Sequence, residues 1–181
     1  MRVMIDACVL YPTVMREVLL GCAKEGLFEP RWSARILEEW ARAVVKLGPE
    51  QEVIARGEIA ALGAAFPDAV VSHGADYERQ FWLPDVNDIH VLAAAVAGSC
   101  DAILTMNHKD FPRDILADAM VERLGPDLFL CDLLAEAPDQ ARGVADAVLA
   151  RANELSDQPW QMRALMKKAR LPRFGKALAR D

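Results

Sequence analysis

The stretch that decides the fold is VNDIHVLAAAVAGSCDAILTMNHKDFP, residues 86–112. Its first half is apolar with helical spacing, follows Pro84 and Asp85, and stops at Gly98, so it predicts a helix. Residues 101–105 then predict a buried strand that runs into a polar turn. A helix followed directly by such a strand is typical of an α/β fold with a parallel sheet.

The rest of the chain continues this alternation. Residues 2–10 predict a buried first strand that ends near Asp6, and Ser33 is a suitable N-cap for a helix that ends at Gly48. The other predicted strands are residues 69–72 and 127–132, and the other predicted helices are residues 14–26, 50–66, 115–125, 139–154 and 160–170. We predict a parallel sheet flanked by helices over residues 1–135, and a basic helical extension over residues 136–181.

Composition places limits on the class of protein. The chain has 181 residues, of which 53% are hydrophobic and 27% charged, enough to bury a core. No two of its four cysteines form a C-x-x-C pair, which disfavours a zinc site and predicts free thiols. The N-terminus lacks the layout of a signal peptide, and no apolar run approaches the roughly 20 residues that span a bilayer. We therefore expect a cytoplasmic protein with no membrane contact.

Charge is unevenly distributed along the chain. Residues 156–181 hold seven basic and two acidic residues, whereas the remaining 155 residues carry a net charge of −11. The basic segment also contains an apolar stripe with helical spacing. Packing of this segment on the domain, contact with RNA and docking of a protein partner are all compatible with the pattern.

Polar side chains follow two of the predicted strands. Asp6 lies at the end of the first strand, and Asn107 and Asp110 follow the strand at residues 101–105. Ligands of parallel α/β sheets bind beyond the carboxyl ends of the strands. An acid between apolar residues is costly to bury unless it is paired or bound to a metal. These three residues are therefore candidates for one site.

Helix geometry adds two further candidates. Glu38 falls opposite the apolar face of its predicted helix, whereas Glu39 falls on the border of that face. In the helix that follows Pro84, Asp88 lies on the apolar side and His90 points away from it, so we do not assign His90 as a base. Asp85 is explained as an N-cap. Glu39 and Asp88 are therefore the candidates to face the site.

Clustered carboxylates persist only if some of them are protonated or a cation neutralises them. Two of them about 4 Å apart repel by about 4 kcal/mol at an effective dielectric near 20. Oxygen ligands without Cys or His favour Mg²⁺ or Mn²⁺, which can activate water and stabilise charge on a phosphoryl group. The chain has no phosphate-binding glycine motif, no G-x-S-x-G and no H-x-x-x-H. The residues alone predict an acidic metal site on an α/β fold.

The ordered pattern resembles the PIN-domain family of metal-dependent ribonucleases, and among them the VapC-like toxins of bacterial toxin–antitoxin pairs. The matching pieces are VMIDACVLYPTVMREVLL, RWSARILEEWARAV, LPDVNDIHVLAAAVAGSCDAILTMNHKDFP and LPRFGKALARD. The resemblance implies a parallel sheet with an acidic pocket that holds Mg²⁺ or Mn²⁺ and hydrolyses RNA phosphodiesters. It also implies an antitoxin partner and a homodimer.

The resemblance assigns the family's three acids to Asp6, Glu39 and Asp88. Where many relatives have a fourth acid directly after T-x, this chain has Asn107, with Asp110 three residues later. Both remain candidates for the catalytic and metal set, and we favour Asn107 as the pocket residue. Arg16, which we expect at the exposed start of its predicted helix, and Thr105 are candidate contacts to phosphate.

Two other functions fit parts of the pattern. A metal-dependent phosphohydrolase acting on a small phosphate ester would use the same site, although such enzymes usually carry a second Asp where this chain has Cys8. A non-catalytic module that binds RNA or protein would retain the acids without using them.

Overall fold

The structure is a computed structural model that describes residues 1–180, and these residues form two compact units. Unit 1 comprises Met1–Tyr11 and Phe28–Leu124, and unit 2 comprises Pro12–Leu27 and the chain from Gly125 onward. The boundary near residue 135 stays a prediction. Asp181, the last residue of the predicted extension, lies outside the described residues.

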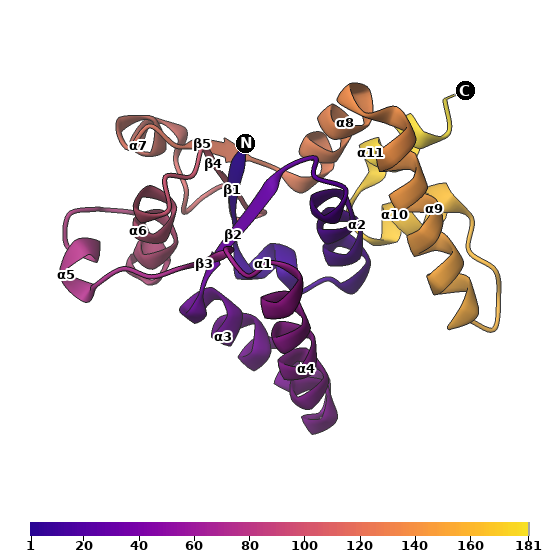
Figure 1. Cartoon of the computed structure of the whole chain (residues 1–181), viewed down its shortest axis with the longest axis horizontal. Coiled ribbons are helices and arrows are strands. Elements are labelled where there is room, and N and C mark those ends of the chain that lie inside the picture. Colours follow the sequence, from indigo (N-terminus) through magenta and orange to yellow (C-terminus); the bar gives the residue numbers. More distant parts are fainter. Residues whose placement is uncertain (181) are drawn as a thin grey trace. The chain divides into compact units, whose positions relative to one another are not determined.

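Unit 1 contains a five-stranded parallel sheet with the strand order β3-β2-β1-β4-β5 (Figure 1). Its elements are β1 (Arg2–Ile5), α1 (Ala7–Leu10), β2 (Glu29–Ser33), α3 (Ala34–Ala43), the 3-10 helix η1 (Val44–Leu47), α4 (Pro49–Ala65), β3 (Val70–Val71), α5 (Ala75–Glu78), the 3-10 helix η2 (Val86–Asp88), α6 (Ile89–Ala97), β4 (Ala102–Leu104), α7 (Arg113–Asp118) and β5 (Glu122–Leu124). The predicted α/β fold with a parallel sheet and flanking helices is confirmed.

The residues of the central strand β1 show that the sheet is covered on both faces. Val3, Met4 and Ile5 are all 0% exposed, as expected of a parallel strand covered on both sides. Helix α6 packs against β1, β2, β3 and β4, and six consecutive residues of this helix are buried. The helix ends at Gly98, where an added Cβ would lie 2.7 Å from Val71 Cγ2, so this close approach favours glycine.

Unit 2 is helical. It consists of α2 (Thr13–Lys24), α8 (Pro126–Glu136), α9 (Pro138–Glu154), α10 (Met162–Lys168) and α11 (Pro172–Leu178), which pack on one another (Figure 1). The strand predicted at residues 127–132 is wrong, because this apolar run lies in the first half of α8. Its helical start has a recognisable signal, Gly125 followed by a proline at the first helical position.

Four other elements differ from prediction. The strand β2 was not predicted, and it includes Pro30. The helix predicted at 115–125 ends at Asp118, and its last residues form β5, which pairs with β4. The helix predicted to begin at Asp85 is divided into η2 and α6, and the one predicted over 34–48 into α3 and η1. Ser33 caps α3 as predicted, since its hydroxyl accepts from Ile36 N at 3.2 Å.

All four cysteines are free thiols, as predicted. Within residues 1–180, no helix combines the length and the apolar character needed to cross a membrane.

Candidate active site

The candidate residues from the two strand ends meet because β1 and β4 are neighbours in the sheet. Their pairing runs from Val3 with Ala102 to Ile5 with Leu104. The backbone N–H of Asp6 then donates to Leu104 O at 3.1 Å, which extends the pairing by one residue. Asp6 and the turn after β4 therefore lie at the same carboxyl edge of the sheet, where parallel sheets bind ligands.

Asp6 is held by two donors that both reach its Oδ2 atom. The hydroxyl of Thr105 donates at 2.6 Å and the thiol of Cys8 at 2.9 Å, while Asp6 is only 7% exposed. Burial, together with the neighbouring charge of Asp6, raises the pKa of the Cys8 thiol to about 12, so the thiol stays protonated as a donor. Among the described residues no donor reaches Oδ1 of Asp6, which leaves that oxygen available to a ligand.

Three further carboxylates converge. Asp85, Asp88 and Asp110 each place one oxygen within 4.8 Å of the others, and we call these three residues the acidic cluster. Burial raises the pKa of Asp88 to about 6, and the charges of Asp6, Asp85 and Asp110 contribute. The charge of Asp6 therefore acts on the acidic cluster, where it favours the protonated form of Asp88.

Asp85 has two roles in this arrangement. Its Oδ1 atom accepts from the backbone N–H and from the amide Nδ2 of Asn87, both at 2.9 Å, which is the predicted cap at the start of η2. The same carboxylate also belongs to the acidic cluster. Sequence reasoning missed this second role because the capping role already accounted for an acid at this position.

Asp110 belongs to the acidic cluster, whereas Asn107 contacts it from outside. Asp110 is one of its three carboxylates, whereas Asn107 donates from Nδ2 to Oδ2 of Asp88 at 3.0 Å. The backbone N–H of Asn107 donates to the Thr105 hydroxyl at 2.9 Å. Because that hydroxyl is fully buried and already serves Asp6 and Asn107, its geometry favours positioning of these residues over contact with phosphate.

Glu39 lies outside the acidic cluster. Its Oε1 atom accepts from Arg35 Nε at 3.1 Å and lies 3.0 Å from Nε2 of His90. Burial acts to raise the pKa of Glu39, but the contacts with His90 and Arg35 outweigh it and lower the pKa. His90 is 1% exposed, and although its Nε2 is close to Glu39, the ring orientation does not meet hydrogen-bond geometry. The expectation that His90 points away from the buried side is therefore wrong.

Arg16 lies on α2 in unit 2 and is only 7% exposed. The expectation of an exposed arginine at this helix start is wrong. Its contact with phosphate stays a prediction.

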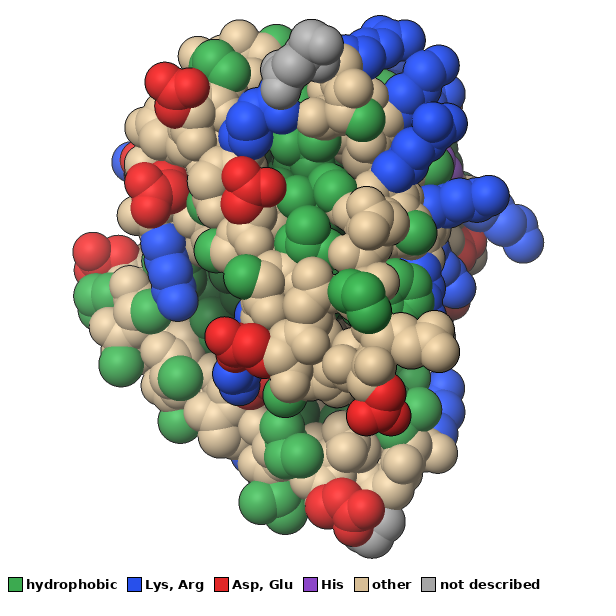
Figure 2. Space-filling view, turned by 90° about the vertical axis from the view of Figure 1, so that its right-hand side faces the viewer, with side chains coloured by type: hydrophobic (Ala, Val, Ile, Leu, Met, Phe, Trp, Pro, Cys, Tyr) green, Lys and Arg blue, Asp and Glu red, His purple; other side chains and the backbone are tan. Residues whose placement is uncertain are grey.

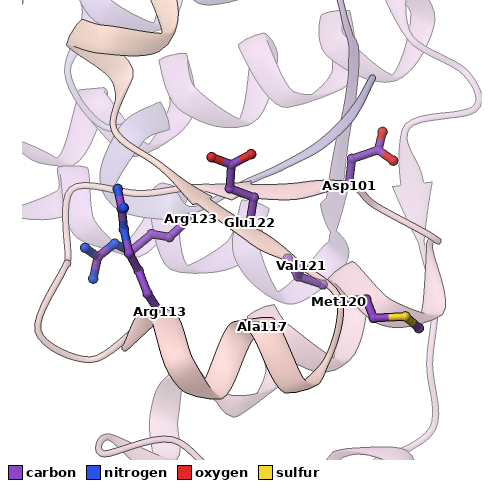
Figure 3. Close-up of a pocket in the computed structure, with 7 residues that line it drawn as sticks. All are labelled: Asp101, Arg113, Ala117, Met120, Val121, Glu122 and Arg123. Atoms are coloured by element: carbon purple, nitrogen blue, oxygen red, sulfur yellow. The ribbon is translucent and has the colours of Figure 1, made fainter.

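Arg123 was not predicted, yet it holds the turn that carries Asp110. From β5, its Nη1 atom donates to the backbone carbonyls of His108 at 2.8 Å and Phe111 at 2.9 Å, on either side of Asp110. Arg123 also lines a shallow pocket of about 400 Å³ beside α7 (Figure 3). The other lining residues are Asp101, Arg113, Ala117, Met120, Val121 and Glu122. Sequence spacing gives no signal for this role, because the acceptors are backbone carbonyls.

The oxygen atoms at this site suit a divalent cation as ligands. Carboxylate oxygens are the ligands that Mg²⁺ and Mn²⁺ prefer, and the three of the acidic cluster are close enough to share one ion. Burial, together with the charges of Asp6, Asp85 and Asp110, raises the pKa of Asp88, and a bound cation would offset both effects. The available geometry thus suits an ion held by oxygen ligands at the carboxyl edge of the sheet.

Comparisons with known proteins agree with this arrangement. The family model of the PIN domain matches residues 2–109. A putative ribonuclease VapC50 from Mycobacterium tuberculosis (strain ATCC 25618 / H37Rv) is 35% identical over 79 residues, which is 44% of this chain and 45% of that protein. The match thus spans less than half the length of this curated relative. No solved structure matches significantly.

Proposed function

The chain belongs to the PIN-domain family, and we propose that it is a Mg²⁺- or Mn²⁺-dependent endoribonuclease that hydrolyses RNA phosphodiester bonds. The observation that carries the proposal is the acidic cluster at the carboxyl edge of a PIN-domain sheet, where one ion can join three carboxylates. The name of the similar protein, a putative ribonuclease, supports the choice of RNA as substrate.

We assign the metal-binding role to Asp6 and to the three carboxylates of the acidic cluster. When bound, a divalent cation would neutralise these carboxylates, activate water and stabilise charge that develops on the phosphoryl group. Thr105 and Cys8 hold Asp6 in place through Oδ2. Asn107 fixes Asp88 by its amide. Glu39 completes the set as a residue that orients water, with its own orientation fixed by Arg35.

We further propose that the protein is the toxin of a toxin–antitoxin pair and inhibits translation. The support is the resemblance of its ordered motifs to VapC-like toxins and the VapC name of the similar protein. Under this proposal a cognate antitoxin masks the acidic cluster, and the active form is a homodimer.

The test is cleavage of RNA by the purified protein. With Mn²⁺ or Mg²⁺ we expect cleavage of single-stranded RNA that EDTA stops. Asp6→Asn and Asp88→Asn should each lower the rate at least about a thousandfold, because each removes a charge that binds the ion. The control is Asp118→Asn, an exposed carboxylate on α7, which should cut like the parent.

Other outcomes separate the alternatives. Release of phosphate from a generic phosphomonoester with RNA left intact would indicate a phosphohydrolase on a small ester. Calorimetry that detects no binding of Mg²⁺ or Mn²⁺ at millimolar concentrations would indicate a non-catalytic module. Parental rates for either active-site variant would exclude the assignment of its residue.

A further inference from the structure

The C-terminal helices α10 and α11 have a buried apolar side and a basic outer side. Leu165, Met166, Phe174 and Leu178 are at most 6% exposed, and they fix the two helices against the rest of unit 2. The basic residues of the segment are all exposed, and we call them the basic surface: Arg163, Lys167, Lys168, Arg170, Arg173, Lys176 and Arg180. Packing therefore explains the apolar stripe of this segment and leaves its charge unexplained.

Helix stability accounts for only some of these charges. Lys167, Lys168 and Lys176 lie in last turns, where a cation favours the helix dipole. Arg163 and Arg173, however, are the second residues of α10 and α11, where a positive charge is unfavourable. A separate residue caps the start of α11, since Asp127 accepts from the backbone N–H groups of Arg173 and Phe174.

Ion pairing does not account for them either. In unit 1, Arg42 and Arg56 each lie within 3.0 Å of a carboxylate oxygen of Glu38. Over residues 1–180, no side chain of the basic surface takes part in an ion pair, and the segment from residue 156 to 180 contains a single acid, Asp157. Lys168 is held instead by Trp160, with its Nζ atom 4.7 Å from the ring centroid.

The surroundings favour a polyanion over a protein. Among the described residues from 156 to 180 there is no large exposed apolar side chain, whereas the centre of a protein interface is usually apolar and poor in charge. Lys and Arg side chains also gather at the upper right of the face in Figure 2, where acidic side chains are sparse. The rest of the chain carries a net charge of −11 and would repel a nucleic acid. A substrate of negative charge therefore needs an attractive surface of its own.

We propose that the basic surface binds the phosphate backbone of single-stranded RNA. This rests on the proposed ribonuclease function, in that RNA is the polyanion chosen. The interaction is electrostatic and independent of base sequence, so it should weaken with salt in proportion to the number of phosphates that the surface neutralises.

The test compares two variants with the same change in charge. Arg163→Glu combined with Lys167→Glu alters exposed positions one turn apart on α10, while Lys24→Glu combined with Lys46→Glu alters exposed lysines elsewhere. Binding is measured by fluorescence anisotropy, with a labelled 12-nucleotide single-stranded RNA in EDTA, so that cleavage does not interfere. Thermal unfolding of each variant verifies the fold.

We expect the α10 variant to bind RNA at least about tenfold more weakly at low salt. Its plot of log affinity against log salt should be less steep by about 1.4, that is about 0.7 for each phosphate that the variant no longer neutralises. The control variant should change affinity less than about twofold. In cleavage assays, the KM of the α10 variant should rise while kcat stays at the parental value.

Parental RNA affinity in the α10 variant would overturn the inference. So would retained RNA binding together with weaker binding of a polyglutamate peptide, which would identify a protein-docking surface. The two proposals fail separately. If the parent binds RNA through α10 but cuts none, the ribonuclease function fails and this inference stands. If the α10 variant cuts RNA with an unchanged KM, this inference fails and the ribonuclease function stands.

Discussion

The acidic cluster of unit 1 and the basic surface of unit 2 both concentrate like charges, but in different environments. The three carboxylates are partly buried, and each places one oxygen within 4.8 Å of the others. Burial together with repulsion from neighbouring carboxylates raises the pKa of Asp88 to about 6. The seven cations of the basic surface are exposed and screened by solvent. We therefore expect the cluster to depend on each residue individually, and the basic surface to act as a sum of small contributions.

After the losses expected for Asp6→Asn and Asp88→Asn, the largest effect should separate Asp110, a member of the cluster, from Asn107, which lies beside it. Asp110→Ala removes one of the three carboxylates, so we expect Mn²⁺ affinity and the cleavage rate to fall about a hundredfold or more. Asn107→Ala removes only the hydrogen bond to Asp88, so the fall should be about tenfold. Isothermal titration with Mn²⁺ measures both. Greater loss in Asn107→Ala than in Asp110→Ala would support the preference for Asn107 that the sequence suggested.

Arg123 tests whether the cluster depends on its supporting loop. Arg123→Gln shortens the side chain and removes the guanidinium whose Nη1 atom donates to His108 O and Phe111 O. The turn that carries Asp110 should therefore be held less firmly. We expect about a tenfold loss in Mn²⁺ affinity and in kcat, with KM for RNA unchanged, and partial rescue by Arg123→Lys.

The control for this loop is Arg113→Gln. Arg113 lines the same pocket but donates no hydrogen bond to the described chain. Its substitution should leave Mn²⁺ affinity at the parental value. If both variants lose affinity equally, the effect comes from the charge of the pocket, and the two carbonyl contacts are not its cause.

Sequence patterns predicted the residues at the strand ends better than the network that holds them. Asp6, Asp88 and Asp110 could be found because an acid after a buried strand, or on a buried helix face, conflicts with hydrophobic patterning. Asp85 could not be found in this way, because its role as the cap of η2 already accounts for an acid there. Arg123 could not be found either, because it donates to backbone carbonyls, which every residue has.

The fold shows the same limit at short elements. The long helix α9 was predicted from its periodicity, whereas residues 127–132 were predicted as a strand and lie in α8. A short apolar run has no period that distinguishes helix from strand, and only the tertiary partners decide. The three-residue β5 was predicted as helix for a related reason, since its pairing with β4 supplies the stability that local propensity does not.

A smaller effect should appear in the pH dependence of stability without metal. The pKa of Asp88 is raised from 3.8 to about 6, so between these values the folded state binds more protons than the unfolded state. The free energy of unfolding should therefore fall as pH rises through this window. Because Asp88 is partly exposed, we expect about 1 kcal/mol after solvent screening.

The comparison with Asp88→Asn isolates this contribution. Urea unfolding in EDTA at pH 4.5 and 7.5 should show the parent losing about 1 kcal/mol more than the variant over that range. Saturating Mn²⁺ should reduce the difference, because the ion stabilises the ionised carboxylate. Identical pH dependence in parent and variant would mean that the cluster is not electrostatically strained.

The smallest effect should come from one residue of the basic surface. Arg173→Gln removes one exposed charge at the start of α11 and leaves the backbone N–H that bonds to Asp127 in place. One screened charge among seven should change RNA affinity only about twofold to threefold at low salt, with a salt slope less steep by about 0.7. The control is Arg151→Gln on α9, whose guanidinium pairs with Glu154 at 3.0 Å and should contribute nothing to RNA binding. A loss of a hundredfold in Arg173→Gln would break the contrast with the acidic cluster, since it would mean that this arginine makes a specific contact that its neighbours do not share.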